Sequence, residues 1–136
     1  RSFYNECDIF VAPSRYESFG LVFLEAMVFG KPVIAGDAGG GPEVVTHEKS
    51  GLLVPPGDAG ALGAALNRLL ADPGLRIRLG QNARRDYETR FTDAVMVRDF
   101  LAAFTRMGIR AEPDVTSRNR PATNETNNVR LMALRA

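Results

Sequence analysis

The chain has 136 residues, 45% of them hydrophobic and 24% charged, which suits one modest soluble globular domain and excludes two full ones. A formal net charge of +1 gives no support to a nucleic-acid partner. The single cysteine, Cys7, excludes an intrachain disulfide and a cysteine metal cluster, and it is compatible with a cytoplasmic location. Residues 1–7 contain no apolar segment of the signal-peptide type, and the longest apolar stretch, Gly20–Gly30, is too short to span a bilayer.

Short apolar segments alternate with helical ones in the first half of the chain. Residues 1–7 have the character of a helix tail, and because Arg1 is not preceded by methionine we expect a fragment. The expected strands are residues 8–14, 32–36 and 51–54, with helices over 21–29 and from 42 to 45 between them. The helix over 21–29 is apolar on every face, which predicts burial on all sides. This alternation predicts an α/β fold, a Rossmann-like parallel sheet with flanking helices.

Three amphipathic helices and a tail follow. The expected helices are residues 59–71 after Asp58, 74–90 after Asp72-Pro73, and 92–107 opening at Thr92. Residues 111–128 are rich in Asn, Thr, Pro and charge, a composition too polar to offset the entropy of ordering. We therefore expect one domain over residues 1–107 and a disordered tail over 108–136.

Charge is unevenly distributed along the chain. Residues 1–73 contain five Lys or Arg and nine Asp or Glu, whereas residues 74–110 contain eight Arg and four acidic residues. A basic helical surface favours peripheral contact with an anionic membrane face. A solvated helix face explains the same excess of arginine more simply.

The segment from Glu17 to Glu25 contains the best candidates for ligand binding. A helix that begins near Gly20 directs its free N–H groups into the crevice at the carboxyl end of the preceding strand, an arrangement suited to a diphosphate. The hydroxyls of a ribose would satisfy both oxygens of Glu25, and Glu17 could accept hydrogen bonds from a second sugar ring. Solvation, or pairing with Arg15 or Lys31, is the competing explanation for the two glutamates.

The glycine run Gly39–Gly41 leads from the second expected strand into a short helix. Its N–H groups could bind an anion or the edge of a base, although a tight turn explains the glycines about as well. The only histidine, His47, lies in a polar turn beside Glu48, which argues against acid–base catalysis. No spacing of ligand residues predicts a metal site.

In order and spacing, these segments resemble glycosyltransferase family 4, whose members have the GT-B fold. The resemblance covers residues 1–107 and corresponds to the C-terminal, nucleotide-sugar-binding half of that fold. The matching motifs are DIFVAPS at 8–14, ESFGLVFLEA at 17–26, GKPVIA at 30–35, GGPEVV at 40–45 and GLLVPPGD at 51–58.

The resemblance implies a retaining transfer of a sugar from a nucleotide diphosphate sugar, with no cofactor and no essential metal. It implies that Glu17 is the catalytic residue, in contact with the donor sugar, and that Glu25 binds the ribose. The rest of the implied donor site consists of Ser18, Phe19, Gly20, Leu21 and Val22 around the diphosphate, and Gly40 and Gly41 near the nucleotide.

The chain also departs from the family. The N-terminal acceptor domain, the first strands of the C-terminal domain and their basic residues are absent, so we expect a donor-binding part that is inactive alone, with an unknown acceptor. The family's Gly-rich turn before Gly51 is replaced by His47–Ser50. The alternatives are a non-catalytic nucleotide-sugar-binding module, a remnant of a truncated gene, and another GT-B chemistry, such as nucleotide-sugar epimerisation or phosphorolysis.

Overall fold

The computed structural model describes residues 3–109. Its elements are α1 Phe3–Glu6, β1 Phe10–Ala12, α2 Leu21–Val28, β2 Val33–Gly36, α3 Gly41–Val44, β3 Gly51–Val54, α4 Ala59–Ala71, α5 Pro73–Arg90 and α6 Asp93–Arg106. Every strand and helix expected over this range is present, with differences of a few residues at the ends. The tail expected from residue 108 lies outside the described residues from residue 110 onward.

The three strands form one parallel sheet in the order β1-β2-β3. Phe10 pairs with Val33, and Val33 pairs in turn with Gly51. All four residues of the central strand are buried, which explains why it is a continuous apolar run without alternation. The predicted α/β architecture is therefore confirmed.

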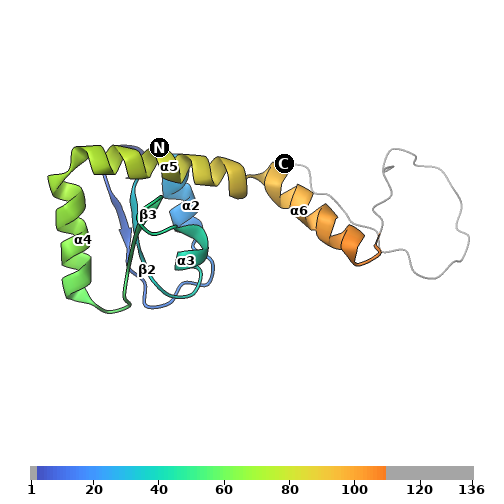
Figure 1. The fold of residues 1–136 in the computed structure, drawn as a ribbon, viewed down its shortest axis with the longest axis horizontal. Helices are drawn as coiled ribbons and strands as arrows, with labels where there is room; N and C mark the ends of the chain where they lie inside the picture. Colours follow the sequence, from blue (N-terminus) through green and yellow to red (C-terminus); the bar gives the residue numbers. More distant parts are fainter. Residues whose placement is uncertain (1–2, 110–136) are drawn as a thin grey trace, which may run out of the picture. The chain divides into compact units, whose positions relative to one another are not determined.

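Helices cover both faces of this sheet (Figure 1). Val33 and Ala35 of β2 pack with α2, α3 and the later part of α5. Ile34, which points to the opposite face, packs with α4 and the beginning of α5. Successive residues of a strand face opposite sides, so one apolar strand supplies both halves of the core.

Helix α5 passes from one face of the sheet to the other. Leu79 packs in the core on the α4 side, whereas Ala83 packs on the α2 side. Between them, Gly80 lies so close to the end of α2 that a Cβ there would stand 2.0 Å from the carbonyl oxygen of Gly30. Gly30 precedes β2, so the crossing is at the amino end of the strands (Figure 1).

Three arginines of α5 bind the carboxyl ends of three other helices. Arg76 donates to the carbonyl of Leu69 in α4 at 2.6 Å, Arg84 donates to the last residue of α2, Val28, and Arg90 donates to Glu43 in α3 at 2.7 Å. Carbonyls at a helix end lack partners within the helix and favour positive charge. Much of the arginine excess after residue 74 therefore holds the fold together, a role that neither interpretation of this charge anticipated.

The aspartate cap predicted at Asp58 is confirmed, and Asp72, expected only as part of the break after that helix, is a second cap. Asp58 accepts a hydrogen bond from the N–H of Ala61 at 2.8 Å, and Asp72 accepts one from Leu75 at 2.9 Å. Such caps satisfy donors that the first helical turn leaves free. Asp72 is the C-cap of α4 and also the N-cap of α5, so one residue ends one helix and begins the next.

The chain separates into two units, Arg1–Val95 and Met96–Ala136. Most of α6 lies in the second, where Phe100 and Phe104 pack with their ring centroids 5.9 Å apart. None of the helices in residues 3–109 is long and apolar enough to cross a membrane. The expected domain boundary at residue 107 stays a prediction.

The turn before β3 contains a strained residue that the sequence did not reveal. Glu48 has φ 63°, in the left-handed region where a Cβ is unfavourable. Its carboxylate accepts two hydrogen bonds from the Arg68 guanidinium, which lower the pKa of Glu48. Its positive φ therefore gives Glu48 a conformational cost that glycine would not carry.

We expect Glu48→Gly to be more stable than Glu48→Ala by about 1 kcal/mol, because glycine adopts positive φ without steric cost. Both variants lose the pair with Arg68, so that loss cancels in the comparison. Urea unfolding of the two variants measures the difference. Equal stability would show that φ at residue 48 relaxes at no cost.

Candidate functional site

The loops that follow β1 and β2 leave the same edge of the sheet and lie against each other. The N–H of Gly40 donates to the carbonyl of Glu17 at 2.6 Å. A Cβ on Gly39 would stand 2.2 Å from that same oxygen, and one on Gly40 would stand 2.5 Å from the carbonyl oxygen of Phe19. The glycines thus allow backbone-to-backbone packing, which brings the two predicted parts of the site together.

The amino end of α2 lies at this edge. Gly20 caps the helix with φ 94° and no side-chain hydrogen bond, and its carbonyl accepts from the N–H of Phe23 at 2.9 Å. The N–H groups of Leu21 and Val22 have no acceptor among residues 3–109. Two free N–H groups and the positive end of the helix dipole form a surface suited to an anion.

The two glutamates flank this helix end in different environments. Glu17 is half-buried, and its carboxylate has no hydrogen bond or ion pair within residues 3–109. Glu25 is exposed and accepts a hydrogen bond from the hydroxyl of Tyr4 at 2.5 Å. Over the described range neither glutamate pairs with Arg15 or Lys31, so the ion-pair explanation is wrong.

Tyr4 is held in place by aromatic contacts. Its ring stacks on Phe29 with centroids 5.7 Å apart and packs against Phe10 at 5.4 Å. The hydrogen bond to Glu25, with smaller contributions from burial and the nearby negative charge, raises the pKa of Tyr4 to about 12. Because this bond favours the protonated phenol, it stabilises the fold below pH 10. That stabilisation is lost as the pH rises from 10 through about 12.

Glu25→Gln should lower the pKa of Tyr4 towards its ordinary value of about 10, because the amide removes the negative charge and the strongest acceptor. The ultraviolet absorbance of tyrosinate, followed with pH and assigned through a Tyr4→Phe variant, measures this. An unchanged titration in Glu25→Gln would mean that the bond to Glu25 does not form in solution.

Comparison with known proteins shows the family to which the chain belongs. Residues 1–86 match the family of glycosyl transferases group 1. The chain belongs to the group 1 glycosyltransferases. The D-inositol 3-phosphate glycosyltransferase of Jonesia denitrificans is 43% identical to this chain over 104 residues, which are 76% of this chain and 24% of that protein.

Two solved structures share the fold of this group 1 glycosyltransferase chain. Sucrose-phosphate synthase from Thermosynechococcus elongatus has 41% identity and a TM-score of 0.70, over 78% of this chain and 27% of that one. Anabaena Alr3699/HepE in complex with UDP-glucose has 33% identity and a TM-score of 0.67, over 78% and 29%. The fold is therefore that of GT-B glycosyltransferase C-terminal domains, and the chain spans about a quarter of the length of the curated relatives it matches.

One prediction about helix α2 of this group 1 glycosyltransferase chain is wrong. The helix was expected to be buried on all sides, yet Leu21 is 65% exposed, Val22 is 39% exposed and Glu25 is also exposed. The sheet and α5 cover only part of the helix surface, and that part contains the buried side chains of Phe23 and Met27. Apolar composition does not reveal how many neighbours a helix has.

Gly40 and Gly41 are buried, and each allows a close approach of neighbouring backbone. A Cβ on Gly41 would stand 2.1 Å from the carbonyl oxygen of Gly36. Ser18 and Phe19, also expected at the donor site, are exposed beside the end of α2. His47 has a structural contact, since its Nδ1 accepts from the N–H of Leu53 at 2.9 Å.

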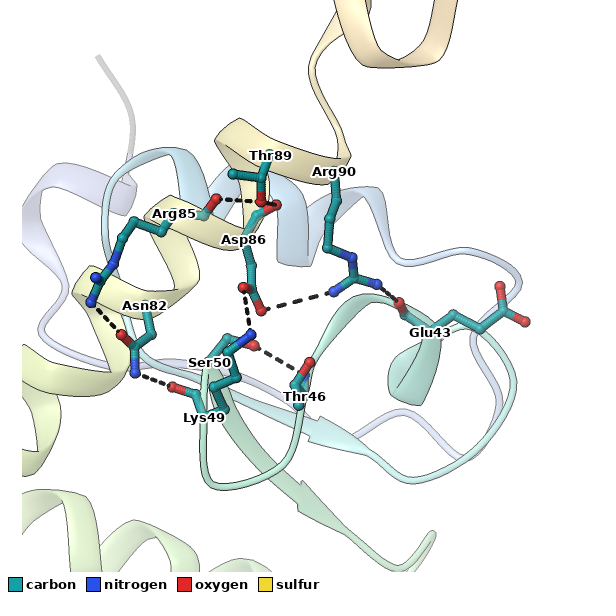
Figure 2. Close-up of polar contacts among 9 residues, drawn as sticks. All are labelled: Glu43, Thr46, Lys49, Ser50, Asn82, Arg85, Asp86, Thr89 and Arg90. Atoms are coloured by element: carbon teal, nitrogen blue, oxygen red, sulfur yellow. Dashed lines mark hydrogen bonds and ion pairs between the residues drawn. The ribbon is translucent and has the colours of Figure 1, made fainter. Parts of the chain in front are cut away.

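A polar network that the sequence did not reveal holds α3 and the following turn against α5 (Figure 2). Asp86 is only 6% exposed and accepts from Lys49 at 3.1 Å. Its other oxygen has no hydrogen-bond partner, and a guanidinium nitrogen of Arg90 lies 3.8 Å away. Arg90 also binds the carbonyl of Glu43, and Asn82 donates to that of Lys49 at 2.9 Å. The network therefore fixes the short helix that follows the glycine loop.

A hollow in the described residues lies away from this site. It is a shallow depression of about 620 Å³ lined by Val28, Phe29, Gly30, Gln81, Arg84 and Arg85. It lies at the carboxyl end of α2, opposite the end with free N–H groups. No group of three or more His, Cys, Asp or Glu in residues 3–109 is placed to hold a metal ion.

Proposed function

We propose that the chain is the donor-binding part of a retaining family 4 glycosyltransferase that transfers a hexosyl group from a nucleotide diphosphate sugar. The observation that carries the proposal is the end of α2, where the free N–H groups of Leu21 and Val22 lie between Glu17 and Glu25 and beside the glycine loop. This arrangement offers separate contacts to a diphosphate and to hydroxyl groups on either side of it.

In this proposal each part of the donor has its own contact. The amides at Gly20, Leu21 and Val22 bind the diphosphate, Glu25 accepts from the ribose, and Glu17 accepts from the donor sugar and assists transfer. The backbone around Gly40 and Gly41 lies near the nucleotide. A solved relative in complex with UDP-glucose supports a nucleotide sugar as the donor. The proposed contacts use no cofactor and no metal.

We further propose that transfer needs an acceptor-binding domain, that the acceptor is a sugar, a lipid-linked sugar or a small molecule, and that the enzyme acts in the cytoplasm. Catalysis between two domains requires groups from both. The chain alone should therefore bind a donor without transferring its sugar.

Amide NMR of the chain, titrated with UDP, GDP, ADP and their glucose conjugates, tests the donor site. We expect the largest shifts at Leu21, Val22, Phe23 and Gly40, and none at Ile77, which is exposed on α5. Absence of any shift up to millimolar nucleotide, or shifts confined to other surfaces, would overturn the proposal.

A test of the stereochemistry of transfer requires an enzyme in which the chain is joined to an acceptor-binding domain. A retaining reaction gives a product with the anomeric configuration of the donor, which NMR of the product reads directly. An inverted product would contradict the retaining assignment and leave donor binding intact.

A further inference from the structure

The hydroxyl of Tyr4 makes the two carboxylate oxygens of Glu25 unlike each other. Tyr4 Oη donates to Oε2 at 2.5 Å, whereas Oε1 accepts no hydrogen bond from residues 3–109. Glu25 is exposed on α2, and Tyr4 reaches it from α1, 21 residues earlier in the chain. One oxygen is held by the protein, and the other stays available to a ligand.

Tyr4 is well suited to hold a side chain still. Its ring lies nearly parallel to Phe29, with an interplanar angle of 13°, contacts Phe10, and packs against the core on the α2 face. An exposed glutamate otherwise samples many rotamers, and ordering it on binding costs affinity. A hydrogen bond from a ring packed in this way removes part of that cost before the ligand arrives.

We propose that Tyr4 is a positioning residue for ribose recognition: it fixes the rotamer of Glu25 so that Oε1 accepts a hydrogen bond from a ribose hydroxyl. The inference rests on the proposed role of Glu25. It replaces the two-oxygen contact expected from the sequence by a one-oxygen contact, and it gives α1 a part in donor binding.

The test compares the wild-type chain with Tyr4→Phe, which keeps the ring and removes the donor. Each is titrated by amide NMR with UDP, GDP and ADP, and with their 2′,3′-dideoxy analogues. We expect Tyr4→Phe to bind the preferred ribonucleotide about tenfold more weakly. Its affinity for the dideoxy analogue should equal that of the wild type, because the bond acts only through the ribose hydroxyls.

Two controls separate this role from a general effect on the fold. Tyr87→Phe alters a tyrosine that packs against the same core, and it should leave both affinities unchanged. In a Glu25→Ala background, Tyr4→Phe should have no further effect on ribonucleotide affinity. An equal loss with ribonucleotide and dideoxy analogue would indicate a structural role and overturn the inference.

The outcomes also distinguish this inference from the proposed function. A wild-type chain that binds none of the three ribonucleotides would overturn both. A wild-type chain that binds while Tyr4→Phe binds equally well would overturn the inference alone. Tighter binding by Tyr4→Phe would overturn it too, since the hydroxyl would then compete with the ribose for Glu25.

Discussion

Gly80→Ala is expected to lower the free energy of unfolding by about 3 kcal/mol, because the added methyl group meets backbone. The new Cβ would stand 2.0 Å from the carbonyl oxygen of Gly30 and 3.5 Å from the ring of Pro32. Neither neighbour is a flexible side chain that can move aside. Relief therefore requires α5 to shift away from α2, which opens the core around Leu79 and Ala83.

Gly63→Ala is the matched control, since it makes the same change inside a helix where a Cβ meets nothing within 4 Å. Alanine is the better helix former by about 1 kcal/mol, so this variant should be more stable than the wild type. Urea unfolding of both variants measures the contrast. If Gly80→Ala also gained stability, the close crossing of α5 and α2 would not exist in solution.

Glu25→Ala should weaken nucleoside diphosphate binding about 100-fold in an enzyme that contains this chain and an acceptor-binding domain. A charged hydrogen bond contributes about 1.5–3 kcal/mol, and in this variant the bond to the ribose is lost, together with the order that Tyr4 imposes. Loss of that affinity should abolish donor binding at ordinary donor concentrations. Titration calorimetry with UDP, GDP and ADP measures the change.

Glu17→Ala should impair sugar transfer more than it impairs nucleoside diphosphate binding. Its carboxylate has no partner within residues 3–109 and is assigned to the donor sugar, so its loss should reduce kcat by more than it reduces nucleoside diphosphate affinity. Steady-state transfer rates beside the same calorimetry separate the two effects. Equal losses of nucleoside diphosphate affinity in the two variants would refute this division of roles.

The parts of the fold that local sequence determines were predictable. A capping aspartate followed by helical spacing predicted α4 with its observed bounds, and three apolar runs predicted the parallel strands. The contact between Glu17 and the glycine loop was not predicted, although it agrees with the rule that the carboxyl ends of parallel strands share one edge of the sheet.

Contacts between distant segments were not predictable in the same way. The bond from Tyr4 to Glu25, the arginine contacts of α5 and the burial of Asp86 depend on which faces of separate helices meet. Periodicity shows that a helix has an apolar face, but it does not show which other elements pack against the helix or how much of its surface they cover. For the same reason the exposed face of α2 was missed.

The arginine contacts of α5 bear on where this domain can be cut. The family match ends at residue 86, yet Arg90, which binds the carboxyl end of α3, lies beyond it. A polypeptide that stopped at the end of the match would leave the Glu43 carbonyl without this partner and Asp86 without its guanidinium neighbour. The smallest portion that keeps the glycine loop in place thus extends at least through Arg90, and expression boundaries, fusions and deletions should be placed after it.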